Sequence, residues 1–266
     1  MLKGYIEGYY GRLFSKDERE KVIKHMSRLG MDFYLYGPKE DLYHRIEWDK
    51  AYPVKEQKIL RDLTIICKKN KIRPIFAISP GLKSSNVSIS DKKNLILKIK
   101  QAQKLGFKEF AIFFDDINHE RNGTLAESHL EMIEIVSSID KVEYEDLFIC
   151  PTVYCTSFAQ GDLENNTYLR VLASEIDPRV SILWTGDEVV SETIPQKGLK
   201  DIRGLFSNPL IIWDNFYAND YCPSRFYIGP YKGRKSIYKF ASAVGINPTG
   251  CLLYTSDAAD DVLCVC

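Results

Sequence analysis

Two aspartates, Asp115 and Asp116, follow the apolar run EFAIFF (109–114) with no residue between them. Adjacent carboxylates repel each other, and the end of a strand has no structural need for both. Burial and a neighbouring negative charge can raise the pKa of one carboxyl while the other stays ionised. Such a pair supplies an anion and a proton donor, which general acid–base catalysis requires. Taken alone, the pair is equally compatible with capping the next helix.

Polar and aromatic residues also follow most of the other apolar runs of the chain. They are Glu7-Gly8-Tyr9-Tyr10-Gly11, Tyr36-Gly37-Pro38-Lys39, Pro151-Thr152-Val153-Tyr154, Trp184-Thr185-Gly186, Trp213-Asp214-Asn215 and Asn247. The combination suits a sugar, because aromatic faces pack on the apolar face of the ring while oxygens and amides bind its hydroxyls. A single lysine or tyrosine after a strand would more often be a salt bridge or rim packing. The recurrence after nearly every run favours one shared site.

The apolar runs that must position these residues alternate with longer amphipathic stretches. We expect strands in eight ranges, which are 3–11, 31–38, 72–81, 109–116, 146–154, 180–186, 209–216 and 241–248. Ser15 and Glu18 form a capping box for a helix that runs to about Leu29 and stops at Gly30. Two further helices are predicted over 54–70 and 90–105, where apolar residues recur at spacings of three and four.

Strand and helix alternating in this way is the pattern of an α/β protein, the (β/α)8 TIM barrel. The chain has 266 residues, which fits a barrel of about 250. The strands are apolar almost throughout, as expected when both faces are covered. A doubly wound open sheet is the weaker alternative. It would usually carry a Gly-rich phosphate turn after its first strand, and GYYGR has only two glycines.

Composition excludes several classes of function. Lys plus Arg and Asp plus Glu number 36 each, which predicts neither a nucleic-acid partner nor a membrane partner. No apolar run approaches the roughly 18 residues of a membrane span, and the N-terminus leaves no room for a signal peptide. The chain is therefore predicted to be cytoplasmic, although a trimmed form of a secreted protein would look the same. The seven cysteines are spaced for neither disulfides nor zinc, so we expect free thiols and no metal.

The C-terminal segment CLLYTSDAADDVLCVC (251–266) continues no periodicity from upstream. It resembles translated sequencing-adapter read-through. We therefore predict a catalytic domain over 1–250 and a non-native tail over 251–266. A genuine but irregular tail is the alternative. On this division the eighth helix of the barrel is missing or replaced by the tail.

Segments in collinear order between residues 3 and 248 resemble the family 84 glycoside hydrolases, the O-GlcNAcase family of β-N-acetylglucosaminidases. They are IEGYYGRLFS, YLYGPKEDLYHRIEW, FFDDI, PTVYC, LWTGDEVVS, WDNFYANDY and GPYKGR. The resemblance implies hydrolysis of terminal β-linked N-acetylglucosamine with retention of configuration. It implies a GlcNAc-bearing glycoside or glycoprotein as the partner and no cofactor, and it leaves a homodimer open.

The resemblance further implies substrate-assisted catalysis, in which the 2-acetamido carbonyl oxygen of the substrate attacks the anomeric carbon and forms an oxazoline. Matching FFDDI to the family motif assigns Asp115 to hold and polarise the acetamido N–H. Asp116 is assigned as the general acid that protonates the leaving oxygen, and then as the general base. Successive residues of an extended chain point in opposite directions, so we expect the pair to reach different parts of one sugar. We expect Asp115 to be ionised and Asp116 protonated.

Other positions carry over from the family motifs. Tyr154 is expected to hydrogen-bond the acetamide or the reacting oxygen and to help form the oxazoline. Trp213 is expected to line the pocket for the acetamido methyl. Contacts to the sugar and its hydroxyls are expected from Gly8 (through its backbone), Lys39, Asn215, Asp220 and Asn247. Arg12-Leu13-Phe14 stands where family members often have Arg-Pro-Trp, a departure at the rim of the site.

Two other interpretations stay open from the sequence. The barrel could bind GlcNAc without turnover, although a pseudoenzyme would be expected to lose one of Asp115, Asp116 and Tyr154. The chain could also be an inactive truncated fragment, because loss of the eighth helix would expose apolar surface at the barrel seam. His44, in the motif LYHR, is predicted to be structural, and His119 to orient a loop.

Overall fold

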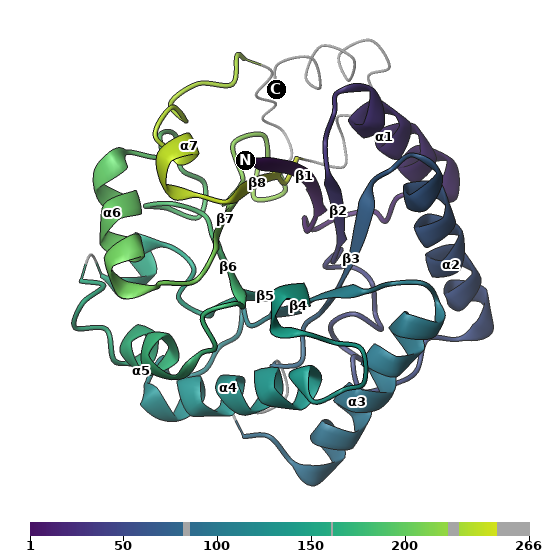
Figure 1. The fold of residues 1–266 in the computed structure, drawn as a ribbon, viewed down its shortest axis with the longest axis horizontal. Coiled ribbons are helices and arrows are strands. Elements are labelled where there is room, and N and C mark those ends of the chain that lie inside the picture. The colour runs from purple at the N-terminus through teal and green to yellow at the C-terminus, as the bar shows by residue number, and fades with distance from the viewer. Residues whose placement is uncertain (82–85, 161, 223–228, 249–266) are drawn as a thin grey trace.

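In a computed structural model, the chain forms a closed barrel of eight parallel strands surrounded by helices (Figure 1). The structure describes residues 1–81, 86–160, 162–222 and 229–248. The strands are β1 (Leu2–Glu7), β2 (Phe33–Tyr36), β3 (Arg73–Ile78), β4 (Glu109–Phe113), β5 (Leu147–Cys150), β6 (Ser181–Trp184), β7 (Leu210–Asp214) and β8 (Ala243–Ile246). Each strand pairs with the next, and β8 pairs with β1 with Ala243 opposite Leu2. The predicted (β/α)8 barrel is confirmed.

Helices of the described residues connect the strands and form the outer layer of the barrel (Figure 1). They are α1 (Lys16–Arg28), α2 (Val54–Lys69), α3 (Ile89–Lys104), α4 (Gly123–Ser137), α5 (Thr167–Glu175), α6 (Gln196–Leu205) and α7 (Ile237–Phe240). Strand β8 is the last element described. The predicted tail over 251–266 and the place of an eighth helix lie outside the described residues, so the division into 1–250 and 251–266 stays a prediction.

The sequence signals at the ends of α1 act as predicted. The Ser15 side chain accepts a hydrogen bond from the Glu18 backbone N–H at 3.3 Å, and the Glu18 carboxylate accepts one from the Ser15 N–H at 2.7 Å. This capping box satisfies two N–H groups that the helix itself leaves unpaired. Gly30 has a φ of 64°, a left-handed conformation that glycine adopts without strain and that ends the helix.

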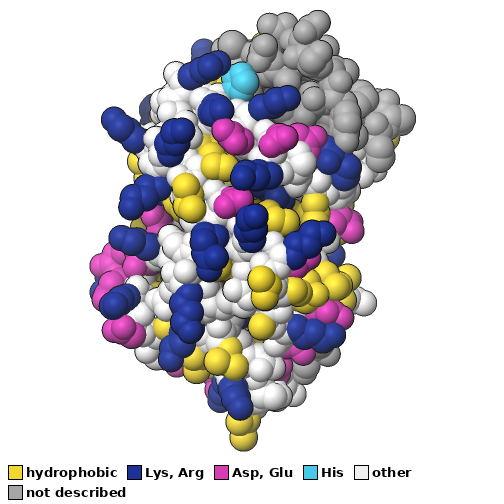
Figure 2. All heavy atoms as spheres, turned by 90° about the vertical axis from the view of Figure 1, so that its right-hand side faces the viewer, with side chains coloured by type: hydrophobic (Ala, Val, Ile, Leu, Met, Phe, Trp, Pro, Cys, Tyr) yellow, Lys and Arg dark blue, Asp and Glu magenta, His cyan; other side chains and the backbone are white. Residues whose placement is uncertain are grey.

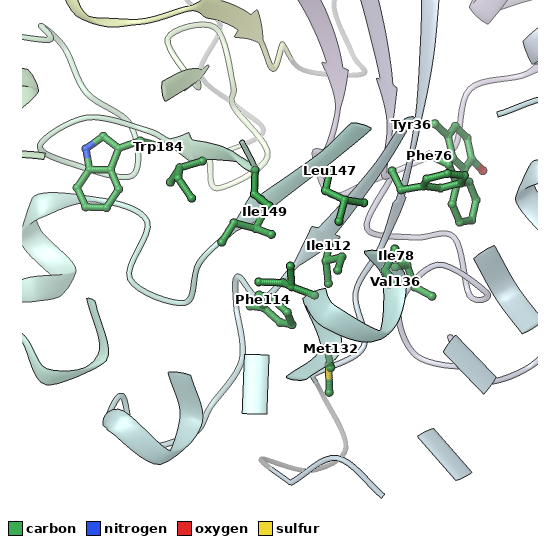
Figure 3. Close-up of a cluster of buried hydrophobic side chains, with 14 of the residues drawn as sticks. Tyr36, Phe76, Ile78, Ile112, Phe114, Met132, Val136, Leu147, Ile149 and Trp184 are labelled. Atoms are coloured by element: carbon green, nitrogen blue, oxygen red, sulfur yellow. The ribbon is translucent and has the colours of Figure 1, made fainter. Parts of the chain in front are cut away.

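Two apolar layers follow from the alternation of side chains along each strand. One set of residues fills the barrel interior and includes Ile6, Ala111 and Phe113. The alternate set packs between the strands and the helices, and Figure 3 shows part of this outer layer. In the figure Ile112 and Phe114, from β4 and the residue after it, lie close to Met132 and Val136 of α4. Each strand is thus covered on both faces, which explains its almost continuous apolar sequence.

The outer face of the helices is charged. Figure 2 shows Lys and Arg side chains spread over the side of the barrel that carries α1, α2 and α3, with Asp and Glu between them. Within the described part of the chain, no helix is long and apolar enough to cross a membrane. Cys67, Cys150 and Cys155 are buried free thiols, as predicted for these positions, and Cys222 is half-buried.

Candidate active site

Side-chain alternation decides which residues after the strands reach the mouth of the barrel. Ile6 and Phe113 belong to the apolar cluster inside the barrel. Because alternate residues of a strand share a face, the positions two residues further on, Gly8 and Asp115, also face the barrel axis. Both line the cavity at the mouth. Trp213 of β7 lies in the interior cluster and lines the same cavity.

Other residues at strand ends point away from the mouth, contrary to the prediction that they converge on it. Trp184 packs in the layer between strands and helices. Glu7 is buried and accepts hydrogen bonds from Arg19 at 2.8 and 3.0 Å. Asp214 is buried and accepts two from Arg234, at 2.8 and 2.9 Å. Trp184, Glu7 and Asp214 each stand next to a residue that faces inward. Alternate residues of a strand face opposite sides, so this alternation is the sequence signal that would have excluded the three from the site.

A cavity of about 640 Å³ lies at the C-terminal ends of the strands. Every residue assigned to the site from the sequence lines it: Gly8, Lys39, Asp115, Asp116, Tyr154, Trp213, Asn215, Asp220 and Asn247. These residues follow different strands, so only the closed barrel brings them together. The cavity is also lined by Tyr10, Cys150, Thr185, Glu188, Val189, Val190, Ala218 and Tyr221, to which no role was assigned. Most of them stand inside the family-like segments, and Tyr10 and Thr185 also follow predicted strands.

Asp115 is the more buried of the two aspartates, with 5% of its surface exposed. Its Oδ2 is in direct contact with the Lys39 ammonium, which is buried as well. Its Oδ1 is buried and accepts no hydrogen bond from the described residues. A buried acceptor without a donor is costly, because the atom has lost its hydrogen bonds to water. Asp115, which lines the cavity, therefore has one acceptor without a partner among the described residues.

Asp116 lies beside it in an unusual backbone conformation. Its φ is 53°, in the left-handed region that a residue other than glycine adopts at an energetic cost. The chain is not extended at this point, so the alternation assumed for the pair does not hold, and the expectation that the two carboxylates reach different parts of one sugar stays a prediction. Both enter the same cavity, and the Lys39 Nζ lies 3.7 Å from the Asp116 carboxylate. The Asp116 side chain keeps 30% of its surface exposed.

Two tyrosine hydroxyls donate hydrogen bonds to Asp116. The Tyr10 hydroxyl lies 2.8 Å from Oδ2, and the Tyr154 hydroxyl lies 3.0 Å from Oδ1. Tyr10 comes from the segment after β1 and Tyr154 from the segment after β5. Each oxygen of Asp116 therefore accepts a hydrogen bond from a hydroxyl, which favours the ionised carboxylate.

The pKa values of the two carboxyls shift in opposite directions. Burial raises the pKa of Asp115 and outweighs the opposing effect of Lys39. Burial also acts to raise the pKa of Asp116, but Lys39 and the hydroxyls of Tyr10 and Tyr154 outweigh it and lower that pKa. The two shifts run opposite to the expected split, in which the pKa of Asp116 would be raised and that of Asp115 would stay low. The hydroxyl donors on Asp116, which depend on long-range geometry, account for the difference.

A network of amide hydrogen bonds forms another wall of the cavity. The Gly8 backbone N–H donates to Asn247 Oδ1 at 3.1 Å, and Asn247 Nδ2 donates to Asn215 Oδ1 at 2.8 Å. The indole N–H of Trp213 donates to the same Asn215 oxygen at 2.9 Å, and Asn215 Nδ2 donates to the Val189 carbonyl at 2.8 Å. Residues after β1, β6, β7 and β8 are thereby held at fixed positions around Trp213.

Gly8 cannot carry a side chain in this arrangement. A Cβ at Gly8 would lie 2.4 Å from Cζ2 of the Trp213 ring, well inside the contact distance of two carbon atoms. The glycine lets the backbone after β1 pack directly against the indole. Two residues further along this segment, the Tyr10 backbone N–H donates to Asp220 Oδ2 at 2.9 Å.

Histidines contribute nothing to the cavity wall. His44 is fully buried, its Nδ1 lies 2.9 Å from the Ala77 carbonyl oxygen, and burial lowers its pKa to about 4. His119 Nε2 lies 3.0 Å from the Gly81 carbonyl oxygen, so it ties together two loops, in keeping with the prediction that it orients a loop. Over the described ranges, no cluster of three or more His, Cys, Asp or Glu side chains is placed to hold a metal ion.

Comparison with known proteins gives consistent matches. The sequence model of the β-N-acetylglucosaminidase family matches residues 3–257. The chain is 33% identical over 241 residues to Protein O-GlcNAcase of Mus musculus and to that of Rattus norvegicus. These matches cover 88% of the chain but 26% of each relative, so the chain spans about a quarter of their length.

Two solved structures of similar fold also match the chain. A mutant of the O-GlcNAc hydrolase of Thermobaculum terrenum superimposes with a TM-score of 0.84 at 29% identity, over 94% of this chain and 55% of that one. The protein named CpGH84B superimposes with a TM-score of 0.85 at 28% identity, over 98% of this chain and 47% of that one. The family match spans nearly the whole chain and agrees with the nine residues gathered at one cavity. The chain therefore belongs to the β-N-acetylglucosaminidase family, family 84 of the glycoside hydrolases.

Proposed function

We propose that this barrel hydrolyses terminal β-linked N-acetylglucosamine with retention of configuration, and that the acetamido group of the substrate acts as the nucleophile. One observation carries the proposal. Asp115 Oδ1 is buried, lacks a donor among the described residues and belongs to a residue that lines the cavity beside Asp116. An acetamido N–H is a donor of the right kind for this acceptor, because its carbonyl stays free to react.

The first step forms one bond and breaks another at the anomeric carbon. The acetamido carbonyl oxygen attacks this carbon while Asp115 accepts a hydrogen bond from the N–H and then its proton. The bond to the leaving oxygen breaks, and Asp116 gives that oxygen a proton. The product is an oxazoline, with Asp115 protonated and Asp116 ionised.

The second step reverses the proton movements. Asp116, now a carboxylate, takes a proton from a water molecule whose oxygen attacks the anomeric carbon on the face that the leaving group left. The oxazoline opens, and its nitrogen recovers the proton from Asp115. Two inversions at one carbon give net retention. Tyr154, through its hydroxyl near Asp116, is proposed to hydrogen-bond the acetamide or the reacting oxygen as the oxazoline forms.

Sugar binding is proposed to reverse the two pKa shifts. A donated N–H stabilises the Asp115 anion, whereas Asp116 must carry a proton to act as the acid. The Lys39 ammonium, in contact with Asp115, supports the anionic form of that residue. The order of the two pKa values is therefore proposed to invert when the sugar is bound.

The remaining wall is proposed to recognise the sugar ring. Trp213 lies in the interior cluster that closes the bottom of the barrel mouth, where an acetamido methyl would find an apolar surface. Asn215, Asn247 and the Gly8 backbone, already linked by hydrogen bonds, are proposed to bind hydroxyls and the acetamido group. Lys39 and Asp220 are proposed to complete the hydroxyl contacts. The natural partner is then a GlcNAc-bearing glycoside or glycoprotein, while the cytoplasmic location and the homodimer stay predictions.

The rate of release from an aryl N-acetyl-β-glucosaminide, set against the matching aryl β-glucoside, tests this function. We expect hydrolysis of the first substrate only, because the second lacks the nucleophile. Equal hydrolysis of both would indicate an enzymic nucleophile and overturn the mechanism. If a folded sample hydrolyses neither, a GlcNAc-binding barrel without turnover becomes the better interpretation. An inactive sample without a cooperative melt would instead indicate an unstable truncated fragment.

A further inference from the structure

Tyr10 makes hydrogen bonds at two separate parts of the site. Its hydroxyl donates to Asp116 Oδ2 at 2.8 Å, and its backbone N–H donates to Asp220 Oδ2 at 2.9 Å. In the proposed function Asp116 faces the leaving oxygen, and Asp220 binds hydroxyls at the distal end of the sugar. Tyr10 therefore connects the carboxylate that binds the sugar with the carboxylate that must protonate the leaving group.

The hydroxyl of Tyr10 opposes the acid role of Asp116. A hydroxyl that donates to a carboxylate stabilises the anion, and a protonated Asp116 could not accept equally at both oxygens. The charged and titratable groups that face Asp116 are Tyr10, Lys39, Arg45, Asp115, Cys150 and Tyr154. Of these, Lys39, Arg45 and the two hydroxyls favour the anion. A protonated Asp116 donates from one of its two oxygens, so one of the two hydroxyls must stop donating to it, by turning its O–H away or by leaving.

Tyr10 is the donor that is free to withdraw. The Tyr154 side chain is 6% exposed and packs edge-on against the Phe158 ring, with centroids 4.9 Å apart. Lys39 is buried in contact with Asp115. Tyr10 is 40% exposed, and the Arg45 guanidinium lies 5.2 Å from the centroid of its ring. Rotation of the exposed phenol into solvent costs little packing, whereas the buried side chains are confined by their neighbours.

We propose that Tyr10 is a positioning residue that holds the Asp116 carboxylate as an anion before a sugar binds and releases it when a sugar binds. Sugar hydroxyls donate to Asp220 and compete with the Tyr10 N–H for its carboxylate. The segment that carries Tyr10 then loosens, its hydroxyl turns to water, and Asp116 takes up a proton from solvent. This inference rests on the proposed function, because it takes Asp116 as the acid and Asp220 as a sugar ligand.

The variant Tyr10→Phe tests the inference through the pH dependence of hydrolysis. The pH profile of kcat/KM reports the free enzyme, and that of kcat reports the complex. Because the pKa of Asp115 lies above that of Asp116 before a sugar binds, the acidic limb of kcat/KM reports Asp116 and the basic limb reports Asp115. Without one hydroxyl donor the pKa of Asp116 rises, so we expect this acidic limb to move up by about 0.5 to 1 pH unit, since two or three donors lower a carboxylate pKa by about two units. Both limbs of kcat should stay in place, because Tyr10 has already left Asp116 in the complex.

Two controls separate this effect from a general disturbance of the site. The pH profile is measured with an alkyl N-acetyl-β-glucosaminide, whose leaving group needs protonation. The first control is the 2,4-dinitrophenyl glycoside, whose leaving group needs no proton, and its pH profile should not shift. Tyr221→Phe removes another hydroxyl at the same cavity, from a side chain that is 67% exposed, and should leave the limb unmoved.

Several results would overturn the inference. An unchanged limb in Tyr10→Phe, an equal shift in kcat and kcat/KM, or a uniform loss of rate at every pH would each contradict it. Asp116→Asn distinguishes failure of the inference from failure of the function. If that variant spares the dinitrophenyl glycoside, Asp116 is the acid and only the role of Tyr10 is refuted. If it does not, the proposed function itself fails.

Discussion

Replacing Asp214 by Asn is expected to destabilise the barrel strongly. Asp214 is 1% exposed at the end of β7 and accepts hydrogen bonds at both oxygens. Oδ1 accepts from Arg234 Nη2 at 2.8 Å and from the Phe216 N–H at 3.0 Å. Oδ2 accepts from Arg234 Nε at 2.9 Å and from the Tyr231 hydroxyl at 2.7 Å. Arg234 is 4% exposed, so the two charges form a buried, doubly hydrogen-bonded pair.

The magnitude follows from what the substitution leaves behind. Asn at this position removes the negative charge and turns one acceptor into a donor that faces other donors, while Arg234 stays charged and buried. Removal of one partner of a buried pair costs about 3–5 kcal/mol. For a domain of this size each kcal/mol lowers Tm by about 2–4 °C, so we expect a fall of about 10 °C. The neighbouring Asn215 carries part of the sugar site, so KM for GlcNAc glycosides should rise as well.

The loss of unfolding free energy is measured by urea unfolding of Asp214→Asn and of the double variant Asp214→Leu/Arg234→Met. The double variant removes both charges and should recover much of the loss, because an apolar pair of similar volume can replace a buried ion pair. Lys24→Gln breaks the solvent-exposed pair with Glu20 and should leave the midpoint unchanged. A loss below about 1 kcal/mol in Asp214→Asn would refute the reasoning, since the buried charge would then be satisfied in some other way.

Asp115→Asn should slow hydrolysis of aryl N-acetyl-β-glucosaminides whatever the leaving group, whereas Asp116→Asn should be rescued by leaving groups that need no proton; equal damage to good and poor leaving groups in Asp116→Asn would refute its role. Gly8→Ala places a Cβ 2.4 Å from the Trp213 indole and should lower the free energy of unfolding by about 1–3 kcal/mol, measured by urea unfolding. Gly204→Ala in α6, where a Cβ would meet nothing within 4 Å, is the matched control and should be neutral or stabilising. His129 is buried with its pKa lowered to about 3, so its contribution to stability is present above pH 6.5 and is lost as pH falls toward 3, at about 1.4 kcal/mol per pH unit. His129→Phe should flatten the dependence of unfolding free energy on pH in that window, and an unchanged slope would contradict the assignment.

Much of the fold could be predicted because its signals are local. The eight apolar runs and the capping box at Ser15 each depend on a few neighbouring residues, and the structure has a strand or a helix at each. The boundaries were less accurate, since the predicted ranges extended past the last paired residue. Strand β4, for example, ends at Phe113, three residues before Asp116. Polar residues after a strand continue its sequence pattern without forming ladder hydrogen bonds, so periodicity alone does not locate the end.

The residues of the candidate site could be predicted from the sequence, but their backbone conformation, hydrogen bonds and pKa shifts could not. Its residues stand in family-like segments, and the closed barrel brings those segments to one cavity. The left-handed φ of Asp116 and the hydroxyl of Tyr10 on its carboxylate depend on contacts between β1, β4 and their loops. Such contacts join residues about a hundred positions apart, so neither composition nor periodicity carries them. The predicted directions of the two pKa shifts, for Asp115 and Asp116, were wrong for the same reason.

The nucleophile of the reaction is tested most directly by weakening it in the substrate. A series of aryl glycosides whose 2-acetamido group carries zero, one, two or three fluorine atoms lowers the electron density on the carbonyl oxygen step by step without adding much bulk. If this oxygen attacks the anomeric carbon beside Asp115, log(kcat/KM) should fall steeply with each added fluorine. A rate that stays flat across the series would show that the acetamido group takes no part, and would contradict the proposed mechanism.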